Sequence, residues 1–205
     1  MDNKSYLNQI SASSRPTQKS TISNLFSSPL TKVLAIGVVA LIIILIVGSI
    51  IGGGNDNTKN KTIALSLHTD NLLITINEYQ PAVKSSNLRS SSASLYSILG
   101  STSSALTTYL TTKYNLKEKD IDEKLLSTET ALYDSLNVDL AEAKINGLLD
   151  RTYARQMAYE ISVIMNREAE IYKNMKDEGL KTSLLTSYDS LEKLYNDFDS
   201  FSESK

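Results

Sequence analysis

The chain begins with polar residues and then carries one long uncharged stretch. Residues 33–51 contain no charged side chain, and only glycines and one serine interrupt their apolar pattern. A helix of about 20 apolar residues is long enough to cross the hydrocarbon core of a bilayer. Ser28 is placed to cap such a helix, Pro29 to begin it, and the glycines at 52–54 to end it. The pattern therefore predicts a single transmembrane helix over residues 29–52.

A cleaved signal peptide is the alternative, because positive charge also precedes its apolar core. Such a core has about 7–15 residues, and the run here is longer and follows a 32-residue polar leader. No small-x-small cleavage site follows the run, and the chain has no cysteine for lipid attachment. We therefore expect an uncleaved anchor in the lipid bilayer.

The distribution of charge predicts the orientation of this anchor. Residues 1–32 hold four of the 21 basic residues and one of the 23 acidic residues, so they carry +3 and the remainder carries −5. Basic residues beside a span stay in the cytoplasm, which places the N-terminus inside and the larger C-terminal part outside. Residues 1–28 are rich in serine and poor in large apolar residues, a composition typical of disorder. We expect a disordered cytoplasmic tail there, and a Gly-rich hinge at 53–57.

Beyond the hinge, apolar residues recur at intervals of three, four and seven, which is the spacing of amphipathic helices. We expect helices over about 58–79, 85–112, 120–146 and 150–179, followed by a last helix whose apolar face ends at Phe198. No sustained period-two alternation indicates a strand. Short connections favour antiparallel neighbours, so the prediction is an all-α fold in which residues 58–205 form an antiparallel four- or five-helix bundle. The number depends on whether Pro81 and Gly179 separate helices or bend them.

The second predicted helix has an unusual composition. Fifteen of the 28 residues at 85–112 are serine or threonine, which compete with the backbone for hydrogen bonds. A disordered linker is the alternative, but the leucine spacing favours a helix with a weak point at Gly100. For the third helix, we expect Asp120 and Glu123 to cap the N-terminus as a pair.

Composition narrows the function. The chain has no cysteine and no tryptophan, so the outer domain must be stabilised by packing. Its mild acidity excludes nucleic acid, whose phosphates require a basic surface. Eleven tyrosines against three phenylalanines suit the rim of a bundle, and a partner surface is the alternative explanation.

Motifs for catalysis and cofactors are absent from the sequence. His68 is the single histidine and is expected to be a surface or packing residue. No Glu-x-x-His pair suits a metal site in a bundle, and no Gly-x-Ser-x-Gly or phosphate-binding loop occurs. We therefore expect no catalytic residue, no metal, no cofactor and no enzymatic activity.

Two weaker features suggest binding. Glu168 falls in the apolar seam of the fourth helix, where a carboxylate must be paired, protonated or wet. A small ligand pocket lined by Arg155, Tyr159 and Glu168 is one hypothesis, and a glutamate that sets register or faces water is the other. Gly48 and Gly52 have the small-xxx-small spacing of a transmembrane dimer, although a hinge or helix stop explains them equally well.

The function expected from these features is that of a membrane-anchored, extracytoplasmic binding or scaffolding module for another protein of the cell envelope. The alternative is a bundle that senses a small ligand. That alternative requires a separate transducer, because the sequence shows neither a second span nor an inner signalling domain.

Overall fold

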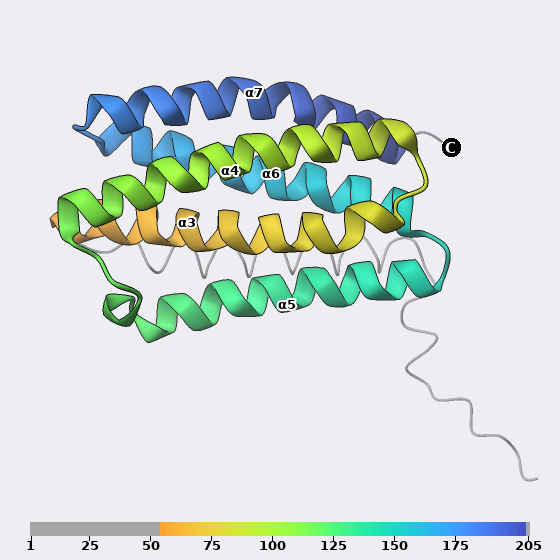
Figure 1. Ribbon diagram of the computed structural model, residues 1–205, viewed down its shortest axis with the longest axis horizontal. Coiled ribbons are helices and arrows are strands. Elements are labelled where there is room, and N and C mark those ends of the chain that lie inside the picture. Colours follow the sequence, from red (N-terminus) through yellow and green to blue (C-terminus); the bar gives the residue numbers. More distant parts are fainter. Residues whose placement is uncertain (1–53, 204–205) are drawn as a thin grey trace, which may run out of the picture. The chain divides into compact units, whose positions relative to one another are not determined.

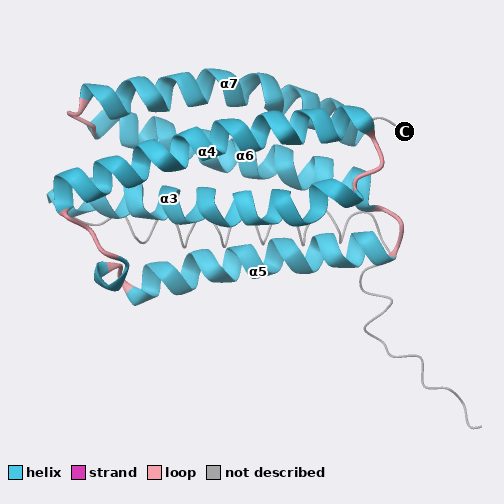
Figure 2. Cartoon of the chain, viewed as in Figure 1, coloured by secondary structure: helices cyan, strands magenta, loops and turns pink. Residues whose placement is uncertain are grey.

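The computed structural model describes residues 54–203, and this part of the chain folds into five α-helices without a strand (Figures 1 and 2). The expectation of an all-helical bundle is confirmed for these residues. The helices are α3 (Gly54–Tyr79), α4 (Ser86–Tyr114), α5 (Glu123–Ile145), α6 (Leu149–Asn174) and α7 (Glu178–Glu203), with 3₁₀ turns η1 (Gln80–Ala82) and η2 (Glu118–Asp120).

The predicted cytoplasmic tail, residues 1–28, and the predicted transmembrane helix, residues 29–52, lie outside the described residues. Within residues 54–203, no helix is both long enough and apolar enough to span a membrane. The hinge predicted at 53–57 differs from the structure, because α3 already begins at Gly54.

Four of the helices form a closed ring around the apolar core. α3 packs on α4, α4 on α7, α7 on α6 and α6 on α3. α5 lies outside this ring, against α3 and α6 (Figure 1). The interior of the ring is filled by large aliphatic and aromatic side chains, which include Leu65, Leu72, Ile76, Leu95, Leu99, Leu106, Met157, Ile161, Ile164, Leu184, Leu191 and Phe198.

The helix contacts show the relative directions of α3 and α5. Asn71 donates to the carbonyl of Glu129, and Tyr79, two turns later, donates to the carbonyl of Asn137, so the two helices run parallel. Consecutive helices are antiparallel neighbours for α3–α4, α5–α6 and α6–α7. The connection from α4 to α5 instead crosses the end of α3, which the expectation of a simple up-and-down order did not include.

The Ser/Thr-rich segment is helical throughout, and α4 continues through Gly100 without a break. Its buried hydroxyls are satisfied inside the helix. Ser92 donates to the carbonyl of Leu88 at 2.6 Å, and Thr102 donates to the carbonyl of Ile98 at 3.0 Å. Because these hydroxyls bond to the preceding turn, they can face the core without leaving a polar group unpaired.

Two predicted boundaries were wrong. Gly179 does not end the fourth helix: α6 ends at Asn174, and Asp177 begins α7 by accepting a hydrogen bond from the amide of Leu180 at 2.8 Å. Gly179 therefore lies in the first turn of α7. A capping carboxylate satisfies a free N–H group, and this local signal outweighs the glycine.

The cap of α5 is also shifted from its expected position. Asp122 accepts from the amide of Leu125 at 3.0 Å, whereas Asp120 accepts from the amide of Lys117 and closes η2. The capping residue is therefore two positions later than predicted. Pro81 lies in η1 and separates α3 from α4, so the bundle has five helices within the described residues.

The first turns of α4 and α6 are joined by one carboxylate. Asp150, expected to open the fourth helix, accepts hydrogen bonds from the amides of Lys84 at 2.9 Å and Ser85 at 2.8 Å. These two amides precede α4, so Asp150 fixes the start of α4 against the start of α6. Both helices therefore begin at the same end of the bundle.

Candidate functional site

The single histidine of the chain lies in the interior, so of the two roles expected for it, surface residue or packing residue, the structure shows the second. His68 belongs to α3 and is 8% exposed. It follows Leu65 by three residues and precedes Leu72 by four, which is the spacing of the buried face. The helix thus directs the imidazole ring toward α5 and α6.

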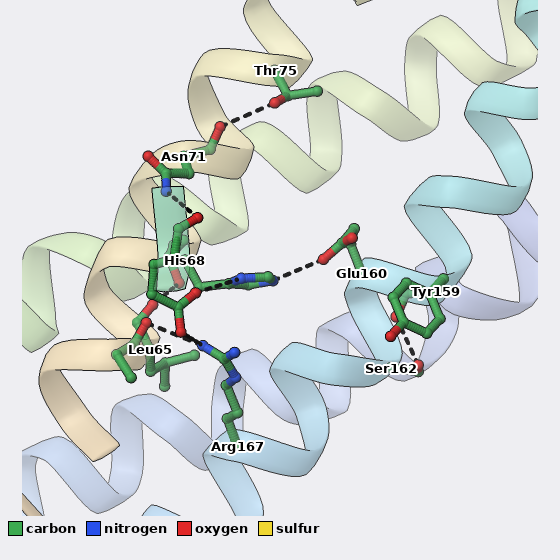
Figure 3. Close-up of polar contacts among 11 residues, drawn as sticks. Leu65, His68, Asn71, Thr75, Tyr159, Glu160, Ser162 and Arg167 are labelled. Atoms are coloured by element: carbon green, nitrogen blue, oxygen red, sulfur yellow. Dashed lines mark hydrogen bonds and ion pairs between the residues drawn. The ribbon is translucent and has the colours of Figure 1, made fainter. Parts of the chain in front are cut away.

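Two buried carboxylates hold the ring from opposite sides. Nδ1 lies 3.1 Å from Oε2 of Glu129 on α5 and forms a hydrogen bond with it. Nε2 lies 2.8 Å from Oε2 of Glu160 on α6, as the dashed line in Figure 3 shows. The second contact has the distance of an ion pair but not the geometry of a regular hydrogen bond. The ring therefore bridges three helices.

Arg167 adds a second cation to this cluster. Its Nη1 donates to Oε1 of Glu129 at 2.8 Å and to the carbonyl of Ala64 at 3.2 Å. Asn71 donates to the backbone carbonyl of Glu129 at 3.3 Å. Glu129 thus receives contacts from both neighbouring helices, through its side chain and its backbone. We call His68, Glu129, Glu160 and Arg167 the charge cluster.

Charge balance explains why the charge cluster tolerates burial. Burial by itself lowers the pKa of His68, but Glu129 and Glu160 outweigh it, so the pKa lies above its ordinary value of 6.5. Burial raises the pKa of Glu129, but His68 and Arg167 outweigh it and leave the pKa below 4.5. With His68 protonated, two cations face two carboxylates, which offsets their loss of hydration.

The charge cluster can pair buried charges with one another, and His68 can exchange its proton. Both ring nitrogens and both oxygens of Glu129 are occupied by protein groups. Among residues 54–203, no group of three or more acidic or histidine side chains is arranged to hold a metal ion. His68 and Glu129 are in direct contact, so the protonation of one affects the pKa of the other.

Glu168 is a third buried carboxyl, on the side of α6 that faces the ring interior. It is 1% exposed, and neither of its oxygens forms a hydrogen bond within the part of the chain that the structure describes. Burial raises its pKa to about 8, an effect that nearby Ser187 partly offsets. The hydroxyl oxygens of Thr102 on α4 and Ser187 on α7 lie 2.9 Å apart, within hydrogen-bond distance. Of the three expected states of this seam glutamate, the structure matches the protonated one.

The three residues of the hypothesised pocket do not share one face of α6. Arg155 and Tyr159 are exposed, whereas Glu168 is buried in the seam. Arg155 and Glu168 are also 13 positions apart, or about 20 Å along a helix axis. Binding of a small ligand beside any of them stays a prediction. Gly48 and Gly52 lie outside the described residues.

Sequence reasoning missed Glu129 and Glu160; it named Arg167 among the arginines that could pair with a carboxylate but did not place it beside Glu129. A signal existed for the two glutamates, because each sits at buried-face spacing. Glu129 follows Leu125 by four residues, and Glu160 follows Met157 by three. The same test that selected Glu168 would therefore have selected both. Arg167 gave no such signal, since a long side chain can reach a buried partner from the edge of a helix face.

No protein-family model, curated protein or solved structure matches this chain in the three comparisons. Its function is therefore inferred from its own residues.

Proposed function

We propose that the chain is a membrane-anchored binding or scaffolding protein, which displays its helical bundle outside a cell membrane and contacts another protein of the cell envelope. The anchor in this proposal is the apolar stretch at 33–51, and the orientation follows from the +3 charge before it. The stretch ends only three residues before α3 begins.

One observation carries the proposal of a protein partner: large apolar side chains are exposed together at the turn between α5 and α6. Ile145, the last residue of α5, is 86% exposed, and Leu148, which precedes α6, is 59% exposed. Val138, seven residues before Ile145 and so on the same side of α5, is 65% exposed. Grouped apolar side chains in water mark interaction surfaces more often than isolated ones do.

The backbone conformation of the turn between α5 and α6 determines that Leu148 is exposed. Gly147 has a φ of 71°, and its amide donates to the carbonyl of Lys144 at 3.3 Å. The amide of Leu148 donates to the carbonyl of Ala143 at 2.8 Å, which completes a Schellman motif. In such motifs the residue at the position of Leu148 frequently packs back on the helix. Here it stays exposed and is available to another molecule.

The turn also lies at a suitable end of the bundle. α3 runs from Gly54 to Tyr79, and η1 then leads to the start of α4, which Asp150 holds against the start of α6. The α5–α6 turn is therefore at the end opposite Gly54, the residue beside which the proposed anchor joins (Figure 1). A partner that contacts this turn would therefore bind at the end of the bundle away from Gly54.

A matched pair of double variants tests the proposal. Ile145→Ser with Leu148→Ser removes the exposed apolar side chains at the turn. Leu126→Ser with Leu185→Ser makes the same change near the other end, at residues 46% and 49% exposed. After crosslinking of intact membranes, we expect the full chain and the control to copurify with a membrane protein and the turn variant to lose it. Recovery of the same complex from both variants would contradict the proposed surface, and recovery of the chain alone in every case would contradict the function.

A further inference from the structure

α5 is attached to the four-helix ring in a different way from the ring helices. It packs on α3 and α6, and its buried apolar side chains are few: Leu125, Leu136, Leu140 and Ala143. α6, by contrast, buries apolar side chains along its whole length. The free energy that holds α5 in place therefore depends more on polar contacts than the free energy that holds the ring together.

These polar contacts come from both neighbouring helices. From α3, Tyr79 donates to the carbonyl of Asn137 at 3.1 Å. From α6, Gln156 donates to Asp139 at 2.8 Å in an exposed position. Three further contacts, buried or partly buried, converge on Glu129, which receives His68 and Asn71 from α3 and Arg167 from α6.

We propose that the charge cluster is a pH-dependent latch, which holds α5 on the four-helix ring while His68 carries its proton and lets α5 loosen when the proton is lost. This inference does not depend on the membrane anchor or on a protein partner. It follows from the position of Glu129, which is the one member of the cluster that α5 contributes.

Loss of one proton changes the balance of a buried site. With His68 charged, two cations face two carboxylates. The site is buried, because no more than 10% of each side chain is exposed for His68, Glu129 and Arg167. With His68 neutral, two carboxylates share one cation. An uncompensated buried carboxylate is costly, and the movement of α5 into water is the simplest way for Glu129 to recover hydration.

The direction of the pH dependence follows from the two pKa shifts. The pKa of His68 is raised, so its stabilising contribution is complete below 6.5 and is lost as the pH rises through the folded value. The pKa of Glu129 is lowered, so its contribution is present above 4.5 and is lost as the pH falls through the folded value. The latch is therefore closed while Glu129 is ionised and His68 is protonated. It opens on the alkaline side, when His68 loses its proton.

The surrounding charges do not reverse this conclusion. Glu129, Glu160 and Arg167 are the charged groups that shift the pKa of His68. Lys61 of α3 is paired with Glu170 of α6 at 3.1 Å. Tyr159 of α6 interacts with Glu160 and Arg167, and partial burial raises its pKa above the ordinary value of 10, so it stays neutral while His68 titrates. The pH response of α5 is thus expected to follow His68.

Distances between pairs of spin labels provide the test, because the chain has no native cysteine. Ser135→Cys on α5 and Ser97→Cys on α4 report the position of α5, and Ser97→Cys with Glu192→Cys on α7 reports the ring; all three side chains are exposed. Both labelled proteins also carry Glu168→Gln in the full chain. This substitution removes the buried carboxyl of Glu168, whose pKa of about 8 would otherwise add a second titration to the test.

We expect one narrow α4–α5 distance at mildly acidic pH and a longer, broader distribution at alkaline pH, with the α4–α7 distance unchanged. His68→Gln should give the broad α4–α5 distribution at every pH, with helix content unchanged by circular dichroism. An α4–α5 distance that stays narrow from mildly acidic to alkaline pH in the chain that retains His68 would overturn the latch. Equal broadening of the α4–α7 distance would also overturn it, since the ring would then be opening as a whole. The first of these results needs no change in the charge cluster, so it stands even if His68→Gln fails to fold.

Discussion

Substitution of Glu168 by glutamine is the perturbation for which the structure gives the largest expected change in stability. The carboxyl lies in the seam of α6, 1% exposed, and its pKa is raised by burial to about 8. In the folded protein it is therefore protonated at neutral pH, whereas in the unfolded chain it ionises near 4.5. Glutamine has nearly the same shape and does not titrate.

The magnitude follows from the two pKa values. Because the pKa is raised in the folded state, the stabilising effect of protonation is complete below 4.5 and is lost as the pH rises toward 8. Each pH unit in that interval costs the folded state about 1.4 kcal/mol. Between about pH 4 and about pH 7 the free energy of unfolding of the unmodified chain should fall by about 3 kcal/mol relative to Glu168→Gln.

Urea unfolding of the full chain and of Glu168→Gln, followed by far-UV circular dichroism at several pH values, measures this difference. Any fixed cost of burying the amide is the same at each pH, and the titration of all other groups is common to both proteins. Both contributions cancel when the difference at acidic pH is subtracted from the difference at neutral pH. A difference between the two proteins that does not change with pH would refute the reasoning, because it would mean that Glu168 ionises in the folded state as readily as in the unfolded one.

Three further pairs of variants test the local structure by the same unfolding measurement. Asp150→Ala should destabilise the chain by about 2 kcal/mol, because two backbone amides lose a charged acceptor. Asp139→Ala, which loses an exposed contact with Gln156, should cost less than about 0.5 kcal/mol. Equal effects would show that Asp150 does not fix α4. Gly147→Ala should cost about 1 kcal/mol, because φ at this residue is 71°. Gly100→Ala should stabilise the chain by about 0.5–1 kcal/mol, since a Cβ there meets nothing within 4 Å in the middle of α4. A stabilising Gly147→Ala with a destabilising Gly100→Ala would contradict the assigned conformations. Tyr79→Phe should lose about 1 kcal/mol with its hydrogen bond to Asn137. Tyr153→Phe should change stability by less, because Ser92, the polar neighbour of its buried hydroxyl, already donates to the carbonyl of Leu88. A larger loss at Tyr153 would contradict this arrangement.

The faces of the helices were predictable from the sequence, because the period of an α-helix is fixed by its geometry and a buried stripe repeats with that period. Ile161, Ile164 and Ile171 of α6 are buried as their spacing indicated. The same regularity located Glu168 in the seam. Burial of a carboxyl without a partner then left protonation as the physical outcome.

The charge cluster was not predictable in the same way, because its contacts depend on how the helices are arranged around one another. His68 and Glu129 are separated by 61 positions, and Glu129 and Arg167 by 38. They meet because α5 lies parallel to α3 and outside the ring, and the sequence-based expectation placed consecutive helices as neighbours. The position of α5 decides which seam residues face each other, and periodicity contains no information about that position.

Helix boundaries were predicted less well where two local signals compete. Glycine usually marks the end of a helix, and Gly179 was assigned that role, but Asp177 begins α7 before it. At the end of α5 the asparagine and the glycine indicate the same boundary. Asn146 and Gly147 end the helix as predicted, because the Schellman motif requires a residue that accepts a positive φ.

Labelling of single cysteines in intact cells is the most direct test of the central claim, which is that the bundle is held outside a membrane by the apolar stretch. Ser135→Cys, exposed on α5, should react with a membrane-impermeant maleimide in intact cells. Ser13→Cys, in the N-terminal stretch, should react only after the cells are permeabilised. Labelling at position 13 but not at position 135 in intact cells would contradict the account.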